Sequence, residues 1–172
     1  GRPGWRAAYD EWLAYFDLLG IRSVCMGWIL VTRADRERPH LRFESWPHPV
    51  AQPVGDVFAR HAAAVDAFQL PTADLLAVRP RLVDVEQETI GRPGAEDPEH
   101  VVFRQRTGLL RAVKADTALA ATLGALDGDL TVGQVLSAVA QVLEVDAAEL
   151  AAALLPDVRQ ALLDQLLVLE AR

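Results

Sequence analysis

The feature that most constrains the fold of this chain is an apolar run at residues 21–31. The run is rich in β-branched side chains, and few polar residues interrupt it. Such a run is typical of a β-strand that is covered on both faces. A chain that contains it needs a sheet with cover on each side, which favours a protein that mixes helices and strands.

The segments on either side of the apolar run complete a helix–strand–hairpin–strand pattern over residues 1–46. Helical spacing predicts a helix at 5–19, which Gly20 ends. Residues 33–40 are polar and 41–46 alternate, which predicts a hairpin and a second strand. The helix carries an aromatic stripe that we expect to pack in a core, made of Trp5, Tyr9, Trp12, Leu13 and Phe16.

A proline-rich connector at residues 47–53 separates this first part from the rest. Pro47, Pro49 and Pro53 fix the backbone and remove hydrogen-bond donors, so an extended segment is expected. We place the main domain boundary there, with an accessory domain at 54–172. Trp46 and His48 flank the first of these prolines.

The accessory domain is predicted to be α+β. Asp116, Thr131 and Asp146 each precede an apolar helical pattern, as N-caps do. Pro156 is expected to break or restart the last of these helices. The expected elements are helices at 54–70 and 74–78, strands at 82–88, 101–106 and 109–113, a loop at 91–98, three short helices and a strand at 166–170.

Composition and charge narrow the environment and the partners. The 172 residues carry a net charge of -7, so binding to nucleic acid would need a local basic patch. A lone cysteine, Cys25, cannot form an internal disulfide, and we expect it to be a buried thiol in a reducing compartment. No apolar stretch is long enough to span a membrane, and no signal peptide is visible. We therefore expect a cytoplasmic protein.

The sequence predicts no catalytic residue, no metal site and no bound cofactor in this chain. The histidines at 40, 48, 61 and 100 lack metal-ligand spacing, and no serine lies in a Gly-x-Ser-x-Gly turn. The glycine-rich loops that cradle phosphates are also missing. Carboxylates at 84–88 and 96–97 are interpreted as solvated surface.

One basic cluster gives candidates for contact with an anion or a partner. Strand alternation would place Arg104 and Arg106 on one face, with Arg111 and Lys114 nearby in the sequence. A charged edge strand that resists pairing is the simpler interpretation, and a contact with an anion or nucleic acid is the alternative. The last helix, at 157–165, carries two carboxylates, which argues against a role in reading DNA.

Several phrases resemble the C-terminal half of actinobacterial class I S-adenosylmethionine-dependent methyltransferases related to the release-factor glutamine methyltransferases. They are Tyr-Asp-Glu-Trp-Leu at 9–13, Gly-Trp-Ile-Leu-Val at 27–31, Trp-Pro-His-Pro-Val at 46–50, Gly-Ala-Glu-Asp-Pro at 94–98, Arg-Gln-Arg-Thr-Gly at 104–108 and Asp-Gly-Asp-Leu-Thr-Val-Gly at 127–133. The family's glycine-rich cofactor loop and its Asn-Pro-Pro-Tyr motif do not occur here. The resemblance therefore implies that the intact enzyme binds S-adenosylmethionine as its cofactor. It does not identify any residue of this chain as catalytic.

The resemblance implies that residues 1–46 are the terminal helix and β-hairpin of a methyltransferase sheet. Residues 101–170 resemble a winged-helix-like module. The expected function is then that of a non-catalytic C-terminal part of a longer enzyme. This part would complete the catalytic sheet and present substrate beside Trp46 and His48. Its partner would be the upstream methyltransferase domain, and the isolated chain should self-associate through the apolar run. The alternative is a free-standing winged-helix-like interaction or regulatory module.

Overall fold

The computed structural model describes residues 4–36, 39–93 and 100–169. The chain mixes helices with two small antiparallel sheets, so the predicted α+β class is confirmed. It divides into two compact units, residues 1–32 and 33–172, and each is described by itself. The predicted loop at 91–98 falls partly on residues 94–99, which lie outside the described part.

The first unit contains one helix, α1 (Trp5–Leu18), close to the predicted range. Gly20, with a φ of 67°, follows it as the expected stop. The expected burial of the aromatic stripe is wrong, because α1 has no buried residue and Trp12 is 60% exposed. Its rings pack on one another instead: Trp5 stacks on Tyr9 at 5.4 Å between ring centroids.

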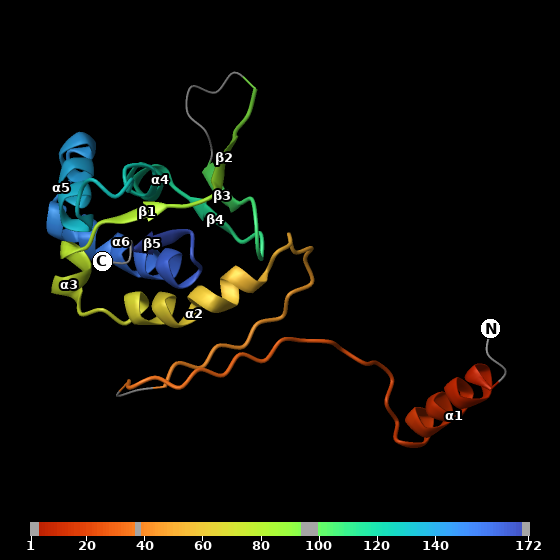
Figure 1. Cartoon of the computed structure of the whole chain (residues 1–172). Coiled ribbons are helices and arrows are strands. Elements are labelled where there is room, and N and C mark those ends of the chain that lie inside the picture. Colours follow the sequence, from red (N-terminus) through yellow and green to blue (C-terminus); the bar gives the residue numbers. More distant parts are fainter. Residues whose placement is uncertain (1–3, 37–38, 94–99, 170–172) are drawn as a thin grey trace. The chain divides into compact units, whose positions relative to one another are not determined.

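The apolar run at 21–31 belongs to no strand in the described structure, and neither does 41–46 (Figure 1). The predicted hairpin of residues 1–46 is therefore wrong for this chain. Met26 is 98% exposed and Ile29 is 93% exposed. The prediction of a buried Cys25 is also wrong, because its side chain is exposed. The physical reason is that a strand covered on both faces needs a ladder and two covering layers, and the described part of the first unit supplies only α1.

The second unit holds the rest of the secondary structure, including the predicted helix after the connector, three capped helices and last strand. Strands β2, β3 and β4 form one sheet in that order, and β1 pairs with β5 in the other. The elements are α2 (Gly55–Phe68), α3 (Thr72–Ala77), β1 (Pro80–Leu82), β2 (Val85–Ile90), β3 (His100–Gln105), β4 (Ala112–Ala115), α4 (Thr117–Gly124), α5 (Val132–Leu143), α6 (Ala147–Leu163) and β5 (Leu167–Leu169).

A leucine-rich core holds the second unit together. Helix α6 packs against α2 and α5, and α2 runs below it in the view of Figure 1. Burying one leucine side chain contributes about 1.5–3 kcal/mol, so the cluster is ample for a stable small domain. Its fully buried leucines are Leu75, Leu123, Leu126, Leu136, Leu162, Leu166 and Leu167.

Local capping explains where the three short helices begin. Asp116 accepts a hydrogen bond from the backbone N–H of Leu119 at 2.8 Å, and Thr131 forms a reciprocal capping box with Gln134. The predicted break at Pro156 is wrong, because α6 continues through it. Val158, on the far side of the proline, is fully buried. Burial of apolar residues before and after Pro156 offsets the cost of about 3 kcal/mol that proline imposes inside a helix.

Two expectations about the strands need correction. Strand β3 lies in the centre of its sheet, so Arg104 is not on an edge strand. Strand β5 pairs with β1, which precedes the expected winged-helix-like range of 101–170. Sequence patterns located both strands but could not choose their partners, because pairing is a long-range property. None of the described helices is both long and apolar enough to cross a membrane.

The second unit begins ahead of the proline-rich connector. Arg36 forms a salt bridge to Asp66 of α2, with Nε 2.7 Å from Oδ1. Ala51 exchanges two backbone hydrogen bonds with Gly108, at 2.8 and 3.1 Å. These contacts hold a residue ahead of the connector and a residue within it to the rest of the second unit, which includes residues 33–53.

Candidate functional site

The two substrate-side candidates from the connector lie together in the structure. Trp46 is half-buried, and His48 approaches it edge-on at 5.5 Å between ring centroids. The guanidinium carbon of Arg111 lies 4.8 Å from the centroid of the Trp46 ring. This is the geometry of a cation–π contact. The β3–β4 connection therefore supplies a residue that fixes Trp46 in place.

Arg111 also belongs to a charge cluster, which we define as Arg42, Glu44, Arg111 and Asp164. Both terminal nitrogens of Arg111 donate to the Glu44 carboxylate at 2.6 Å. Arg42 donates to Glu44 at 2.7 Å and to Asp164 at 2.6 Å. The two positive and two negative side chains thus balance one another. The hydrogen bonds from Arg111 are the largest cause that lowers the pKa of Glu44, to about 2.

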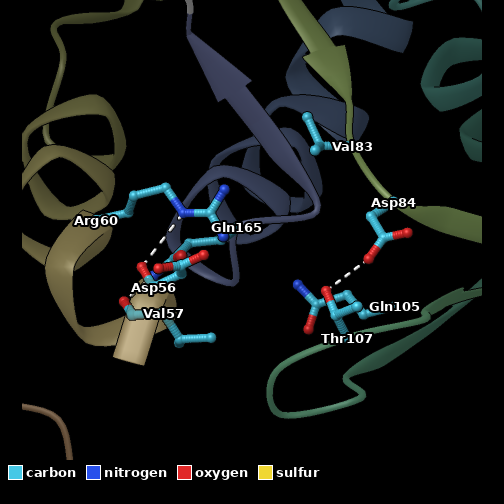
Figure 2. Close-up of a pocket in the computed structure, with 8 residues that line it drawn as sticks. All are labelled: Asp56, Val57, Arg60, Val83, Asp84, Gln105, Thr107 and Gln165. Carbon is cyan, nitrogen blue, oxygen red and sulfur yellow. Dashed lines mark hydrogen bonds between the residues drawn. The ribbon is translucent and has the colours of Figure 1, made fainter. Parts of the chain in front are cut away.

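A pocket of about 240 Å³ adjoins this cluster (Figure 2). Gln105 connects the two: its Nε2 donates to the carbonyl of Asp164 at 2.9 Å, and its Oε1 accepts from the backbone N–H of Arg111 at 3.1 Å. The lining comes from α2, the β1–β2 junction, the end of β3 and the α6–β5 turn. The lining residues are Asp56, Val57, Arg60, Val83, Asp84, Gln105, Thr107 and Gln165.

Hydrogen bonds hold several of the polar side chains of the pocket. Thr107 donates to Asp84 Oδ2 at 2.5 Å, and Gln165 Nε2 donates to the carbonyl of Val57 at 2.8 Å. Asp84 and Gln165 both have positive φ, at 51° and 61°. Such a conformation is costly for residues other than glycine and is often retained at functional sites. The surrounding fold therefore holds this pocket in a defined shape.

The basic candidates Arg104 and Arg106 do not form one open anion site. Arg104 donates to Glu88 on the neighbouring strand at 2.9 Å, and this hydrogen bond raises the pKa of Arg104. Arg106 lies just beyond β3, where its backbone N–H donates to the carbonyl of Asp84 at 2.9 Å. Arg104 is thus already matched to a carboxylate, while the exposed side chain of Arg106 lies close in sequence to the pocket residues Gln105 and Thr107.

Two histidines approach each other near the charge cluster, at His40 and His61. Their ring centroids are 6.5 Å apart. Burial is the largest cause that lowers the pKa of His61, and His40 and nearby arginines lower it further. Within residues 4–36, 39–93 and 100–169, no group of three or more histidine, cysteine or acidic side chains could hold a metal ion.

Sequence reasoning missed most of the pocket. Its residues come from segments up to about a hundred positions apart, and for Asp84 the sequence predicts only a solvated acidic surface. Gln105 lies within the basic segment 104–108, but nothing in its sequence context indicates a pocket. No local spacing links these positions, because the packing of α2 and α6 brings them together.

No protein-family model matches the chain, and neither a curated protein nor a solved structure gives a match. The chemistry of the site is therefore argued from its own residues. Amides, carboxylates, a hydroxyl and a guanidinium line the pocket, and these groups donate and accept hydrogen bonds. The arrangement is suited to binding and positioning.

Proposed function

We propose that this chain is a C-terminal accessory part of an S-adenosylmethionine-dependent methyltransferase. The apolar run at 21–31 would complete the catalytic sheet, and the second unit would help present substrate. The observation that carries the proposal is the exposure of that run, in which Met26, Ile29 and Val31 are each at least 87% exposed. Each large apolar side chain gains about 1.5–3 kcal/mol on burial, so such a run favours a covering partner.

The contrast between the two units supports this division of roles. The second unit buries its own core around α6 and needs no further cover for it. The first unit offers a helix without a buried residue and an apolar segment without a strand partner in the described structure. A segment of this kind gains most from joining a sheet, because its backbone groups and side chains are then satisfied together.

The substrate-side role rests on the connector. Trp46 and His48 lie at the start of the connector, within the second unit, and Arg111 holds Trp46 in place. Aromatic side chains with a fixed orientation give contact area at a low cost in conformational entropy. We assign these two residues to substrate positioning, and no residue of the chain to methyl transfer.

The alternative function is a free-standing winged-helix-like interaction or regulatory module. Its support is the packing of α4, α5 and α6 around one core, with the β1–β5 sheet beside them. The two functions differ in what the apolar run does. A free-standing module would leave the run without a sheet partner, whereas the accessory part would use it.

The experiment that tests the proposed function compares the complete product of the reading frame with this chain. Calorimetric titration with S-adenosylmethionine should show binding by the complete product and none by residues 1–172. A reading frame without a glycine-rich cofactor loop and Asn-Pro-Pro-Tyr motif would contradict the proposal. Saturable binding of the cofactor by the 172-residue chain alone would contradict it too.

Matched variants would locate the contribution of the apolar run. Ile29→Asp places a charge in the run, and Val142→Asp places one on α5, where the side chain is 81% exposed. In the complete product, Ile29→Asp should lower methyl transfer and thermal stability, because a buried unpaired charge is costly. Val142→Asp should change neither. Equal effects of the two variants would show that the run stays in water.

A further inference from the structure

An extended strap, which we define as Arg36 and residues 39–46, lies against α2 and the end of α6. Arg36 forms a salt bridge with Asp66 of α2 at 2.7 Å. Farther along, Arg42 forms one with Asp164, the residue after α6, at 2.6 Å. Residues 39–46 belong to no strand of the described structure, and their side chains hold them to the second unit. The strap therefore stays in place only as long as these side-chain contacts are favourable.

His40 lies between these two salt bridges, with its ring against α2. The centroid of this ring is 5.6 Å from that of Phe68 and 6.5 Å from that of His61. Its Nε2 is buried and has no hydrogen-bond partner among the residues that the structure describes. A charged imidazole carries an N–H on both nitrogens, so a proton at Nε2 would make a buried donor without an acceptor. The strap in this position therefore fits the uncharged ring of His40.

The charged groups around the two histidines disfavour any further positive charge. They come from the strap, α2, the β3–β4 connection and the residue after α6. They are Arg36, Arg42, Glu44, Asp66, Arg111 and Asp164. Each of the three carboxylates already binds an arginine, at 2.6 or 2.7 Å. Burial is the largest cause that lowers the pKa of His61, and repulsion from His40 and the arginines adds to it.

We infer that the contact between His40 and His61 is an acid-sensitive latch, which holds Arg36 and residues 39–41 on α2. With both rings uncharged, the latch is closed. Linkage gives the sign of the pH dependence: a histidine whose pKa is lowered in the closed state binds fewer protons there than in the open state. The closed state is therefore favoured above pH 6.5, the usual pKa of histidine, and is lost as the pH falls below it. The two added charges also repel each other and the neighbouring arginines.

The rest of the strap, residues 42–46, should stay in place when the latch opens. Arg111 holds the pKa of Glu44 at about 2, so this carboxylate keeps its charge at the pH where histidines titrate. The salt bridge of Arg36 is weaker, because the Asp66 side chain is 65% exposed and water screens the pair. Opening therefore moves the first attachment of the chain to the second unit from Arg36 to the later residues of the strap. The latch thus sets the length of free chain that follows the first unit.

The test uses NMR of the 172-residue chain at low concentration, at pH 7.5 and pH 5.0. The lower value lies below the usual pKa of histidine, 6.5, and above that of glutamate, 4.5. We expect nuclear Overhauser effects between the rings of His40 and Phe68 at pH 7.5 and their loss at pH 5.0. The contact between Arg111 and Trp46 should give the same effects at both values. Contacts of His40 that persist at pH 5.0, or an equal loss at Trp46, would overturn the inference.

A pair of variants tests the role of the second histidine. His61→Gln keeps a polar side chain on α2 that stays uncharged at every pH used. His100→Gln, at the start of β3, is the matched control, because it removes a histidine outside the strap and α2. Loss of the contact between His40 and Phe68 should need a lower pH in His61→Gln, since the ring of His40 then faces no second cation. The control should open as the unsubstituted chain does. Opening of a folded His61→Gln variant at an unchanged pH would contradict the inference, and the comparison of the two pH values needs no variant.

Discussion

Arg111 binds Glu44 through two parallel hydrogen bonds, each 2.6 Å long, across 67 positions of the chain. The same guanidinium covers the Trp46 ring. One arginine of the β3–β4 connection therefore holds both the segment before the connector and its first aromatic residue. This relationship makes the start of the connector a fixed part of the second unit, as the assignment of Trp46 to substrate positioning requires.

The first prediction concerns the dependence of stability on pH. Arg111 lowers the pKa of Glu44 from 4.5 to about 2 in the folded protein. Folding therefore favours the ionised carboxylate, and its contribution is complete above about pH 4.5 and is lost as the pH falls toward 2. The Glu44 side chain is 32% exposed, so screening limits the contribution to about 1 kcal/mol.

Glu44→Gln should lower the free energy of unfolding by that amount near neutral pH. The difference from the unsubstituted chain should shrink at about pH 2.5, because the wild-type contribution is then mostly lost. Urea unfolding at the two pH values measures this change. Glu11→Gln, on the exposed surface of α1, is the control. A difference that stays constant with pH would show that Glu44 acts through packing rather than charge.

The second prediction concerns Trp46 and His48. Trp46→Ala should lower the melting temperature, because it removes the ring that Arg111 covers. Trp46→Phe should cost less, since the ring remains and the buried Nε1, which has no partner in the described structure, is removed. His48→Ala and Trp46→Phe should raise the KM of the complete enzyme for its methyl acceptor. If only the melting temperature changed, the substrate role would be wrong.

The third prediction concerns the close approach of Gly108 to α2. Gly108 has a φ of 68°, and a Cβ added there would lie 2.6 Å from Cγ2 of Val57. Gly108→Ala should therefore lower the free energy of unfolding by about 1–3 kcal/mol. Gly124→Ala, in α4, has open space and should be neutral or stabilising by up to about 1 kcal/mol. Thermal unfolding of both variants measures the contrast, and equal changes would contradict it.

Local signals in the sequence predicted most of the helices. Asp116, Thr131 and Asp146 cap α4, α5 and α6 as expected, because a cap depends on residues three positions away. The positions of β3 and β5 followed from alternation and turn residues, whereas β4 begins three residues later than the strand predicted at 109–113. The failures included the strands expected at 21–31 and 41–46, the break at Pro156 and the pairing of β5, where contacts with distant residues, or the lack of them, decide the outcome.

The candidate site was less accessible to sequence reasoning. Trp46 and His48 were selected because they flank a proline, and the structure brings them together. Their partner Arg111 was seen only as a member of a basic cluster. The pocket residue Gln165 carries no sequence signal, because only the packed structure brings it to the carbonyl of Val57, 108 positions away.

The fourth prediction is that the 172-residue chain self-associates through its first unit. The aromatic stripe of α1 and the apolar run are exposed together, with Trp12 at 60% and Ile29 at 93%. Sedimentation velocity should show a dimer or a larger species for the whole chain. Deleting residues 1–32 should give a monomer, since the second unit keeps its own core. A whole chain that remains a monomer at all concentrations would contradict the prediction.

The most direct test of the account follows backbone amide exchange at residues 21–31. It compares the 172-residue chain at low concentration with the complete product of the reading frame. The account predicts fast exchange in the chain alone and protection by about a hundredfold or more in the complete product, because the run would then pair within a covered sheet. Equal, fast exchange in both would contradict the claim that this run completes the sheet of a methyltransferase.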